Sequence, residues 1–297
     1  HNITIIFAVD AGSRSYGCNT ESSDYDIRFV YFYNDKKEYF KLSKFNDTIT
    51  IPDSGNLLDL SGFENLGSLN DHNLGNLFLA FAREYAGDFM VAVRALEQAV
   101  GAVGHVYPIT DMPTELCVRL RSGKVIKGEA EIDRPDYDRT DTIVDAWLEP
   151  VVEASANALA LLKAADAIIF GPGSLYCSVI PILLVSGVKE VLASGSARLI
   201  YVLGSGYELH GETGARRADE FVSQLEYYLP RPFTTIVYNN HVLTAQEQAD
   251  YQSRNWAQIV LDPGRIEASR WIAADLEHAE GGVDPKKLSP LLFNLLA

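Results

Sequence analysis

The sequence has few cysteines and no surplus of basic residues. Its three cysteines, Cys18, Cys117 and Cys177, are odd in number and far apart, which excludes a disulfide framework and the spacing of a zinc site. Its 25 lysines and arginines against 40 aspartates and glutamates give a net charge of −15. Because nucleic-acid-binding surfaces need clustered positive charge, this balance argues against a DNA or RNA partner. We expect a small-molecule ligand and a reducing compartment.

Long apolar runs are also missing, and we expect no secretory leader. The longest apolar stretch, around residues 179–185, contains Pro181 and is much shorter than a membrane span. The chain opens with neither the basic nor the apolar part of a secretory signal. These absences predict a cytoplasmic protein with no membrane span. The hydrophobic content of 47% over 297 residues is that of a globular protein with a sizeable core.

Most of the chain alternates between strand-like apolar runs and segments with helical spacing. Such alternation is typical of β-α-β units and predicts an α/β fold with a Rossmann-like, doubly wound, mainly parallel sheet. Residues 115–132 alternate about a turn at 121–124, which predicts a β-hairpin insertion. The expected strands are 2–9, 25–33, 47–51, 143–148, 166–171, 197–203 and 233–239. The expected helices are 73–100, broken at Gly87, then 154–165, 178–194, 218–229, 244–256 and 284–296.

The composition changes between residues 52 and 72, where Gly, Ser, Asn and Asp become frequent. We therefore place the main domain boundary near residue 70. Residues 1–70 form an N-terminal segment that is expected to supply the first strands of the sheet. Residues 71–297 form the Rossmann-type domain.

Two aspartates, Asp24 and Asp26, lie at the start of a strand-like run. Alternate residues of a strand point the same way, so both carboxylates are expected on one side. Paired carboxylates can hold Mg²⁺ ions, and the turn at Gly12 and Ser13 can hold a triphosphate through its amides and hydroxyl. The pattern predicts a metal site at Asp24 and Asp26 with a phosphate site at Gly12 and Ser13. The alternative is a strand and turn without a working site.

The full string GSRSYGCNTESSDYDIRF, residues 12–29, resembles the predicted nucleotidyltransferases of the DNA polymerase β superfamily. The resemblance covers residues 1 to about 66, and DLSGFE at 59–64 is similar to the family's next acidic strand. It implies that Asp59 is a third catalytic carboxylate beside Asp24 and Asp26. It also implies a Mg²⁺-dependent transfer of a nucleotide to a small molecule or a protein.

Two later segments are typical of phosphate-binding turns. DHNLGNL, residues 71–77, begins a predicted helix, whose free N-terminal amides can bind a phosphate. DAIIFGPGSLYCSVIP, residues 166–181, runs from an apolar strand through a glycine-rich turn into a helix, where the backbone can approach a phosphate closely. The alternatives are a capped helix and a tight turn without a ligand. The predicted ligand-binding residues are His72, Asn73, Gly75, Asn76, Gly171, Gly173, Ser174 and Tyr176.

Residues 71–297 carry, in order, HNLGNL, GPGSLYCSVIPILL, GET at 211–213, and a closing segment that ends GGVDPKKLSPLL. This order resembles the gluconeogenesis factor proteins, relatives of 2-phospho-L-lactate transferase. The resemblance implies a Rossmann-like fold with a phosphate or nucleotide-sugar site. The transferase branch moves a phospholactyl group from a nucleotide diphosphate to a deazaflavin, and the regulatory branch binds UDP-sugars. The GPGSLY segment and the hairpin are more similar to the regulatory branch.

The front of this family's pattern is replaced. In the family, a GGGTG turn follows the first strand and a DDGG turn follows the second. Here AVDAGSRSYG and SSDYDIR stand in their places, so half of the residues expected to form the nucleotide pocket are missing or substituted. Three hypotheses stay open: a nucleotide-sugar-binding regulator or phospholactyl-type transferase, a Mg²⁺-dependent nucleotidyltransferase, and a fused or engineered chain with no complete site. The sequence does not decide whether the chain is an enzyme; if it is, we expect a transferase. It indicates no cofactor apart from the Mg²⁺ of the second hypothesis and is compatible with a homo-oligomer.

Overall fold

The computed structural model describes residues 5–9, 29–33, 79, 87–99, 102 and 104–296 of the chain. The first two of these ranges are strands whose backbone pairing is described. The expected strand at 47–51 lies outside the described residues, and so does the domain boundary near residue 70, which stays a prediction. Within the described part, no helix is both long enough and apolar enough to cross a bilayer.

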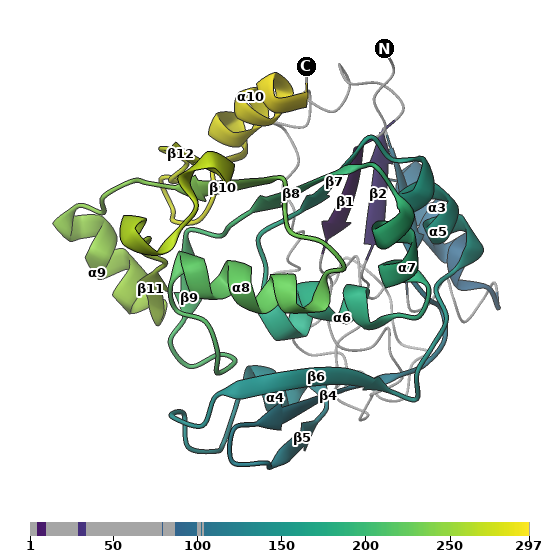
Figure 1. Cartoon of the computed structure of the whole chain (residues 1–297), viewed down its shortest axis with the longest axis horizontal. Coiled ribbons are helices and arrows are strands. Elements are labelled where there is room, and N and C mark those ends of the chain that lie inside the picture. Colours follow the sequence, from purple (N-terminus) through teal and green to yellow (C-terminus); the bar gives the residue numbers. More distant parts are fainter. Residues whose placement is uncertain are drawn as a thin grey trace, which may run out of the picture.

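A seven-stranded sheet runs through the molecule in the order β12-β10-β8-β7-β1-β2-β3 (Figure 1). The five strands from β12 to β1 are parallel, and β2 pairs antiparallel with both β1 and β3. The predicted α/β fold with a mainly parallel sheet is confirmed. The strands are β1 (Ile5–Val9), β2 (Phe29–Tyr33), β3 (His105–Pro108), β7 (Ala167–Phe170), β8 (Arg198–Val202), β10 (Thr235–Asn239) and β12 (Trp271–Ala274).

The described helices follow the predicted spacing with one exception, and the first half of the helix expected at 73–100 lies outside the described residues apart from residue 79. The single helix expected at 178–194 is divided into a π-helical turn, Leu175–Val179, and two α-helices. The division falls where Val185 has an extended backbone and Gly187 has a φ of 91°, which favours glycine. The α-helices of the main fold are α3 (Phe89–Ala99), α5 (Ala156–Ala164), α6 (Ile180–Leu184), α7 (Val188–Ser194), α8 (Ala218–Tyr228), α9 (Ala245–Ser253) and α10 (Pro285–Leu296).

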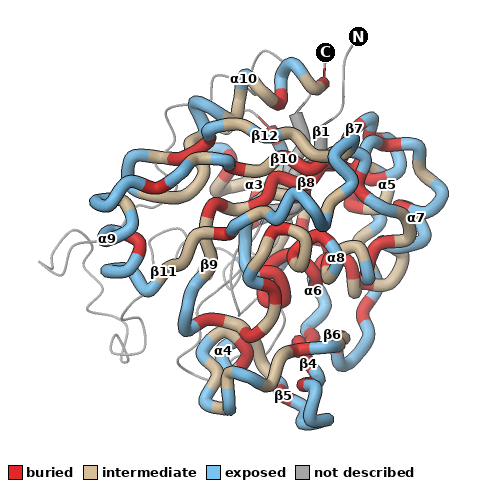
Figure 2. Tube along the Cα trace, turned by 60° about the vertical axis from the view of Figure 1, so that its left-hand side comes forward, coloured by how far each residue is buried: buried red, intermediate tan, exposed pale blue. Residues whose placement is uncertain are grey.

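The central strands bury both of their faces, so the sheet has a core on each side. Ile168 and Phe170 of β7 pack into a large cluster with α5 to α8, whereas Ala167 and Ile169 pack against α10 on the opposite face. Burial on both faces explains why these strands are continuous apolar runs in the sequence. Figure 2 shows the buried residues gathered along the central strands.

The inserted hairpin belongs to a separate antiparallel sheet, in the order β5-β4-β6. The predicted hairpin is present as β4 (Glu115–Leu120) and β5 (Val125–Lys127), followed by a short helix α4 (Glu129–Asp133). The expectation that 143–148 joins the main sheet is wrong: this segment is β6 (Ile143–Glu149) and pairs with β4. Its alternation of buried and exposed residues suits a sheet with one solvated face. Figure 1 places this sheet beyond α6 and α8.

Leu199 on β8 provides a test of the large core, because its side chain is completely buried. We expect Leu199→Ala to lower the free energy of unfolding by about 2 to 5 kcal/mol, since it removes apolar contacts and leaves a cavity. Val242→Ala is the matched control at a position that is 84% exposed, with an expected change within about 0.5 kcal/mol. Urea unfolding followed by circular dichroism measures both. Equal effects of the two substitutions would contradict the described core.

Candidate functional site

A pocket of about 340 Å³ lies at the carboxyl ends of β7 and β8. Its lining includes Pro172, Gly173 and Ser174, which follow β7, and Gly204 and Ser205, which follow β8. Open α/β sheets bind ligands at this edge, close to the point where the strand order reverses. In this sheet the reversal falls between β1 and β7. β1 also ends at this edge, because it runs parallel to β7 in register.

Glu212 binds the amides that begin the π-helical turn after β7. Its Oε1 accepts a hydrogen bond from Leu175 N at 2.5 Å, and its Oε2 accepts from Tyr176 N at 2.8 Å and from Cys177 N at 3.1 Å. Amides in this position are the ones that bind anions at helix N-termini. A carboxylate of the chain itself therefore occupies this anion site. Burial raises the pKa of Glu212 to about 7, against the lowering effect of the three amides.

The loop that carries this carboxylate is fixed by the connection between α4 and β6. Arg139 donates hydrogen bonds to the carbonyl oxygens of His210, at 3.0 Å, and Gly211, at 2.7 Å. The hydroxyls of Tyr137 and Thr213 lie 3.0 Å apart. Residues of the connection between α4 and β6 thus bind two successive carbonyls and one hydroxyl of the loop that carries Glu212. The inserted segment is therefore part of the site, since it positions one wall of the pocket.

A buried polar network supports the opposite wall. Glu277, which is 4% exposed, accepts hydrogen bonds from the Tyr251 hydroxyl at 2.7 Å and from the Asn239 side-chain amide. The same amide donates to the hydroxyl of Ser205 at 2.9 Å, and Ser205 lines the pocket. Buried polar groups are stabilising only when they are bonded in this way. The network connects the carboxyl ends of β8 and β10 and keeps Ser205 in place.

The described lining of the pocket is acidic and aromatic. It contains three carboxylates and four aromatic rings, and no lysine, arginine or histidine is among the described lining residues. The described part of the chain also contains no group of three or more potential metal-binding side chains placed to hold an ion. The pocket can therefore accept hydrogen bonds and pack against rings. The carboxylates are those of Asp133, Glu208 and Glu212, and the rings are those of Tyr201, Tyr207, Phe221 and Trp256.

The structure brings some of the residues predicted from the sequence to this pocket. Gly173 and Ser174 line it and are exposed, and Gly171 lies next to them in the same turn. The Tyr176 hydroxyl lies 3.4 Å from the carbonyl oxygen of Ile143 and 3.3 Å from Gln224 Oε1, beside a different, smaller pocket. The predicted residues that lie outside the described part are Gly12, Ser13, Asp24, Asp26, Asp59, His72, Asn73, Gly75 and Asn76.

Sequence reasoning did not identify Glu212 or Tyr201 as site residues. Glu212 lies in the GET segment, whose position in the chain was noted, but its bonds to amides 35 to 37 residues away are visible only in the fold. Tyr201 lies in an apolar strand and reads as an ordinary core residue. The available signal for Tyr201 was a polar group close to glycines at the end of a predicted parallel strand, and for Glu212 it was the GET segment itself.

The raised pKa of Glu212 makes the stability of the protein depend on pH. Between about pH 4.5 and about pH 7 the folded chain holds more protons at this side chain than the unfolded chain, so stability falls as the pH rises. Glu212→Gln removes this dependence. We expect urea unfolding to show that wild type loses on the order of 2 kcal/mol relative to Glu212→Gln between pH 5 and pH 7.5. The opposite trend would show that the amides hold the pKa below its ordinary value.

Two family models match the chain. Residues 43–276 match 2-phospho-L-lactate transferase CofD, and residues 1–66 match the RNA repair pathway DNA polymerase beta family, RlaP. A Thermotoga maritima relative is 32% identical over 217 residues, which cover 73% of this chain and 63% of that protein. The gluconeogenesis factor of Bacillus subtilis is 28% identical over 208 residues, which cover 69% of this chain and 64% of that protein.

The fold has a close counterpart among solved structures. The crystal structure of protein BH3568 from Bacillus halodurans has a TM-score of 0.67 and 25% sequence identity, covering 77% of this chain and 75% of that one. The chain spans 63% of the Thermotoga relative and 49% of one from Deinococcus radiodurans. Both resemblances seen in the sequence are confirmed, although the CofD match begins at residue 43 and overlaps the RlaP match. Because the larger match covers most of its length, the chain belongs to the 2-phospho-L-lactate transferase CofD family.

Proposed function

We propose that this chain binds a nucleotide-sugar of the UDP-sugar type in the pocket at the carboxyl edge of its sheet. The observation that carries the proposal is the position of the glycine-rich turn Pro172–Ser174, which lines a pocket beside the reversal of strand order. Family membership and the likeness to gluconeogenesis factors support a phosphorylated small molecule as the ligand. The role is that of a ligand-binding regulator related to the phospholactyl transferases.

The turn after β7 has the groups that a diphosphate needs. Among the described hydrogen bonds, none uses the amides of Gly173 and Ser174 or the Ser174 hydroxyl, so these donors are available to a ligand. A Cβ at Gly173 would lie 3.2 Å from Ser178 Cβ, which is a tight contact. The absence of a side chain there lets the turn pack closely against Ser178 of the π-helical turn. Backbone donors can bind phosphates without a cationic side chain.

Thermal unfolding with UDP-glucose in the absence of added metal tests this proposal. We expect UDP-glucose in large excess over its Kd to raise the melting temperature of wild type by several degrees, because it binds the folded state alone. Gly173→Asp abolishes the shift, since a carboxylate at the turn repels the diphosphate. Ser196→Asp is the matched control, because it adds the same charge at an exposed position just before β8. This position lies at the amino ends of the parallel strands, away from the pocket at their carboxyl ends.

Calorimetric titration of the same three proteins separates binding from folding. A Gly173→Asp protein that melts normally and still binds UDP-glucose with the wild-type Kd would contradict the assignment of the turn. Wild type that gives no heat of binding and no thermal shift with UDP-glucose would contradict the proposed function itself.

The match of residues 1–66 to the RlaP family favours a second candidate function. Under it, Asp24 and Asp26 hold Mg²⁺ with Asp59 as a third carboxylate, and Gly12 and Ser13 bind a nucleoside triphosphate. Two metal ions held in this way stabilise the attacking and leaving oxygens of a nucleotidyl transfer. The substrate class is a small molecule or a protein.

The double substitution Asp24→Asn with Asp26→Asn tests this second function. We expect a thermal shift with ATP that requires Mg²⁺ in wild type and is lost in the double variant, because neutral amides bind Mg²⁺ weakly. The shift caused by UDP-glucose serves as the internal control and is expected to persist. A Mg²⁺-dependent shift that survives both substitutions would contradict this site. A wild-type chain that responds to neither ligand would favour the third hypothesis, a fused chain with no complete site.

A further inference from the structure

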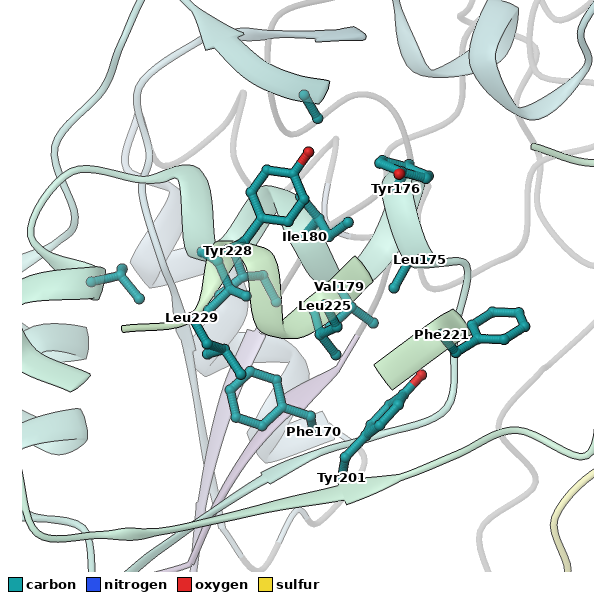
Figure 3. Close-up of a cluster of buried hydrophobic side chains, with 14 of the residues drawn as sticks. Phe170, Leu175, Tyr176, Val179, Ile180, Tyr201, Phe221, Leu225, Tyr228 and Leu229 are labelled. Atoms are coloured by element: carbon teal, nitrogen blue, oxygen red, sulfur yellow. The ribbon is translucent and has the colours of Figure 1, made fainter. Parts of the chain in front are cut away.

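Tyr201 lines the pocket, and its hydroxyl has no hydrogen-bond partner among the described residues. It is 1% exposed, yet it is one of the lining residues. Within the described part of the chain, its hydroxyl takes part in none of the side-chain hydrogen bonds, in contrast to the bonded hydroxyls of Tyr137, Tyr176 and Tyr251. Figure 3 shows this hydroxyl directed toward Phe221, another lining residue, and away from Phe170.

The ring of Tyr201 is held firmly by the core beneath it. It stacks on Phe233 with ring centroids 5.2 Å apart and an interplanar angle of 21°. Phe233 in turn meets Phe170 edge to face at 5.1 Å. The hydroxyl is therefore fixed in direction and cannot turn to find a partner elsewhere. A ligand oxygen in the pocket can therefore accept a hydrogen bond from this hydroxyl in a fixed direction.

The protonation of Tyr201 makes it a hydrogen-bond donor. Burial raises the pKa of Tyr201, and the negative charge of the nearby Glu212 raises it further. The hydroxyl thus stays protonated at neutral pH. It can donate to an oxygen of a ligand while the neighbouring carboxylates accept from the ligand's own hydroxyls.

The charges around this hydroxyl decide which part of a ligand fits. Asp133, Glu208 and Glu212 line the same pocket, and carboxylates repel a phosphate while accepting hydrogen bonds from neutral hydroxyls. The helix-terminal amides that could counter this repulsion are already bonded to Glu212. The rings of Tyr207 and Trp256 supply apolar faces for the carbon side of a sugar. A hydroxyl-rich, uncharged group is therefore the favoured occupant.

We propose that Tyr201 is a ligand-binding residue and that the pocket receives the sugar end of the nucleotide-sugar, with the diphosphate at the Gly173–Ser174 turn. This inference rests on the proposed function and adds the orientation of the ligand. The sugar lies against the carboxylates and rings, where its hydroxyls donate to Glu208 or Glu212 and one of its oxygens accepts from Tyr201. The phosphates lie at the Gly173–Ser174 turn, which is exposed.

Titration calorimetry with two probes, UDP-glucose and UDP, tests the orientation. We expect Tyr201→Phe to raise the Kd for UDP-glucose about tenfold and to leave the Kd for UDP within about twofold of wild type, because only the sugar meets the hydroxyl. Tyr228→Phe is the matched control: it removes the hydroxyl of another buried tyrosine, at a position outside this pocket. It is expected to change neither Kd.

The melting temperature of the free protein distinguishes a contact with the ligand from a structural role. Removal of an unbonded hydroxyl is expected to leave the stability of free Tyr201→Phe unchanged or slightly higher. An equal loss of affinity for UDP and UDP-glucose would overturn the orientation, and so would an unchanged Kd for UDP-glucose. Wild type that binds neither probe would instead contradict the proposed function, so the two failures are distinguishable.

Discussion

The carboxylate of Glu212 connects three parts of the molecule that are distant in sequence. It accepts hydrogen bonds from three successive amides after β7, and its own loop is held by Arg139 from the inserted segment. A charged group removed from water is tolerated only where such bonds replace its hydration. The turn, the loop and the inserted sheet therefore have to be in place together, and the shape of the pocket depends on this one side chain.

This arrangement also changes the chemistry of the sheet edge. A helix-like turn after a parallel strand is commonly an anion site, because its first amides point outward. Here the protein supplies the anion, and the remaining unbonded donors lie one and two residues earlier, at Gly173 and Ser174. The interior of the pocket is lined by carboxylates and aromatic rings. The amides that a ligand could use thus depend on where Glu212 lies in the fold as well as on the glycine-rich turn.

The sheet combines strands from the two matched families. β1 and β2 lie within residues 1–66, which match the RlaP model, whereas β7, β8, β10 and β12 lie within the CofD match. β1 pairs with β7 over four residues in parallel register. A strand edge next to the core needs a hydrogen-bonding partner, and a short apolar, β-branched segment of the right length meets that need. Pairing of the backbone thus imposes few demands on the sequence of the strand that completes the sheet.

The sequence by itself determined the fold class, because burial on both faces forces continuous apolar runs on β7, β8 and β10 and helical spacing between them. It also located the turn at Gly173 and Ser174, since a glycine-rich turn after an apolar strand is a local feature. It did not show that β6 leaves the main sheet, because an alternating strand fits either sheet until its partner is known. The hydrogen bonds of Glu212 and the position of Tyr201 beside the pocket were decided by tertiary structure alone. The residues that they contact lie on other elements of the chain, and contacts between distant elements are set by what the fold brings together.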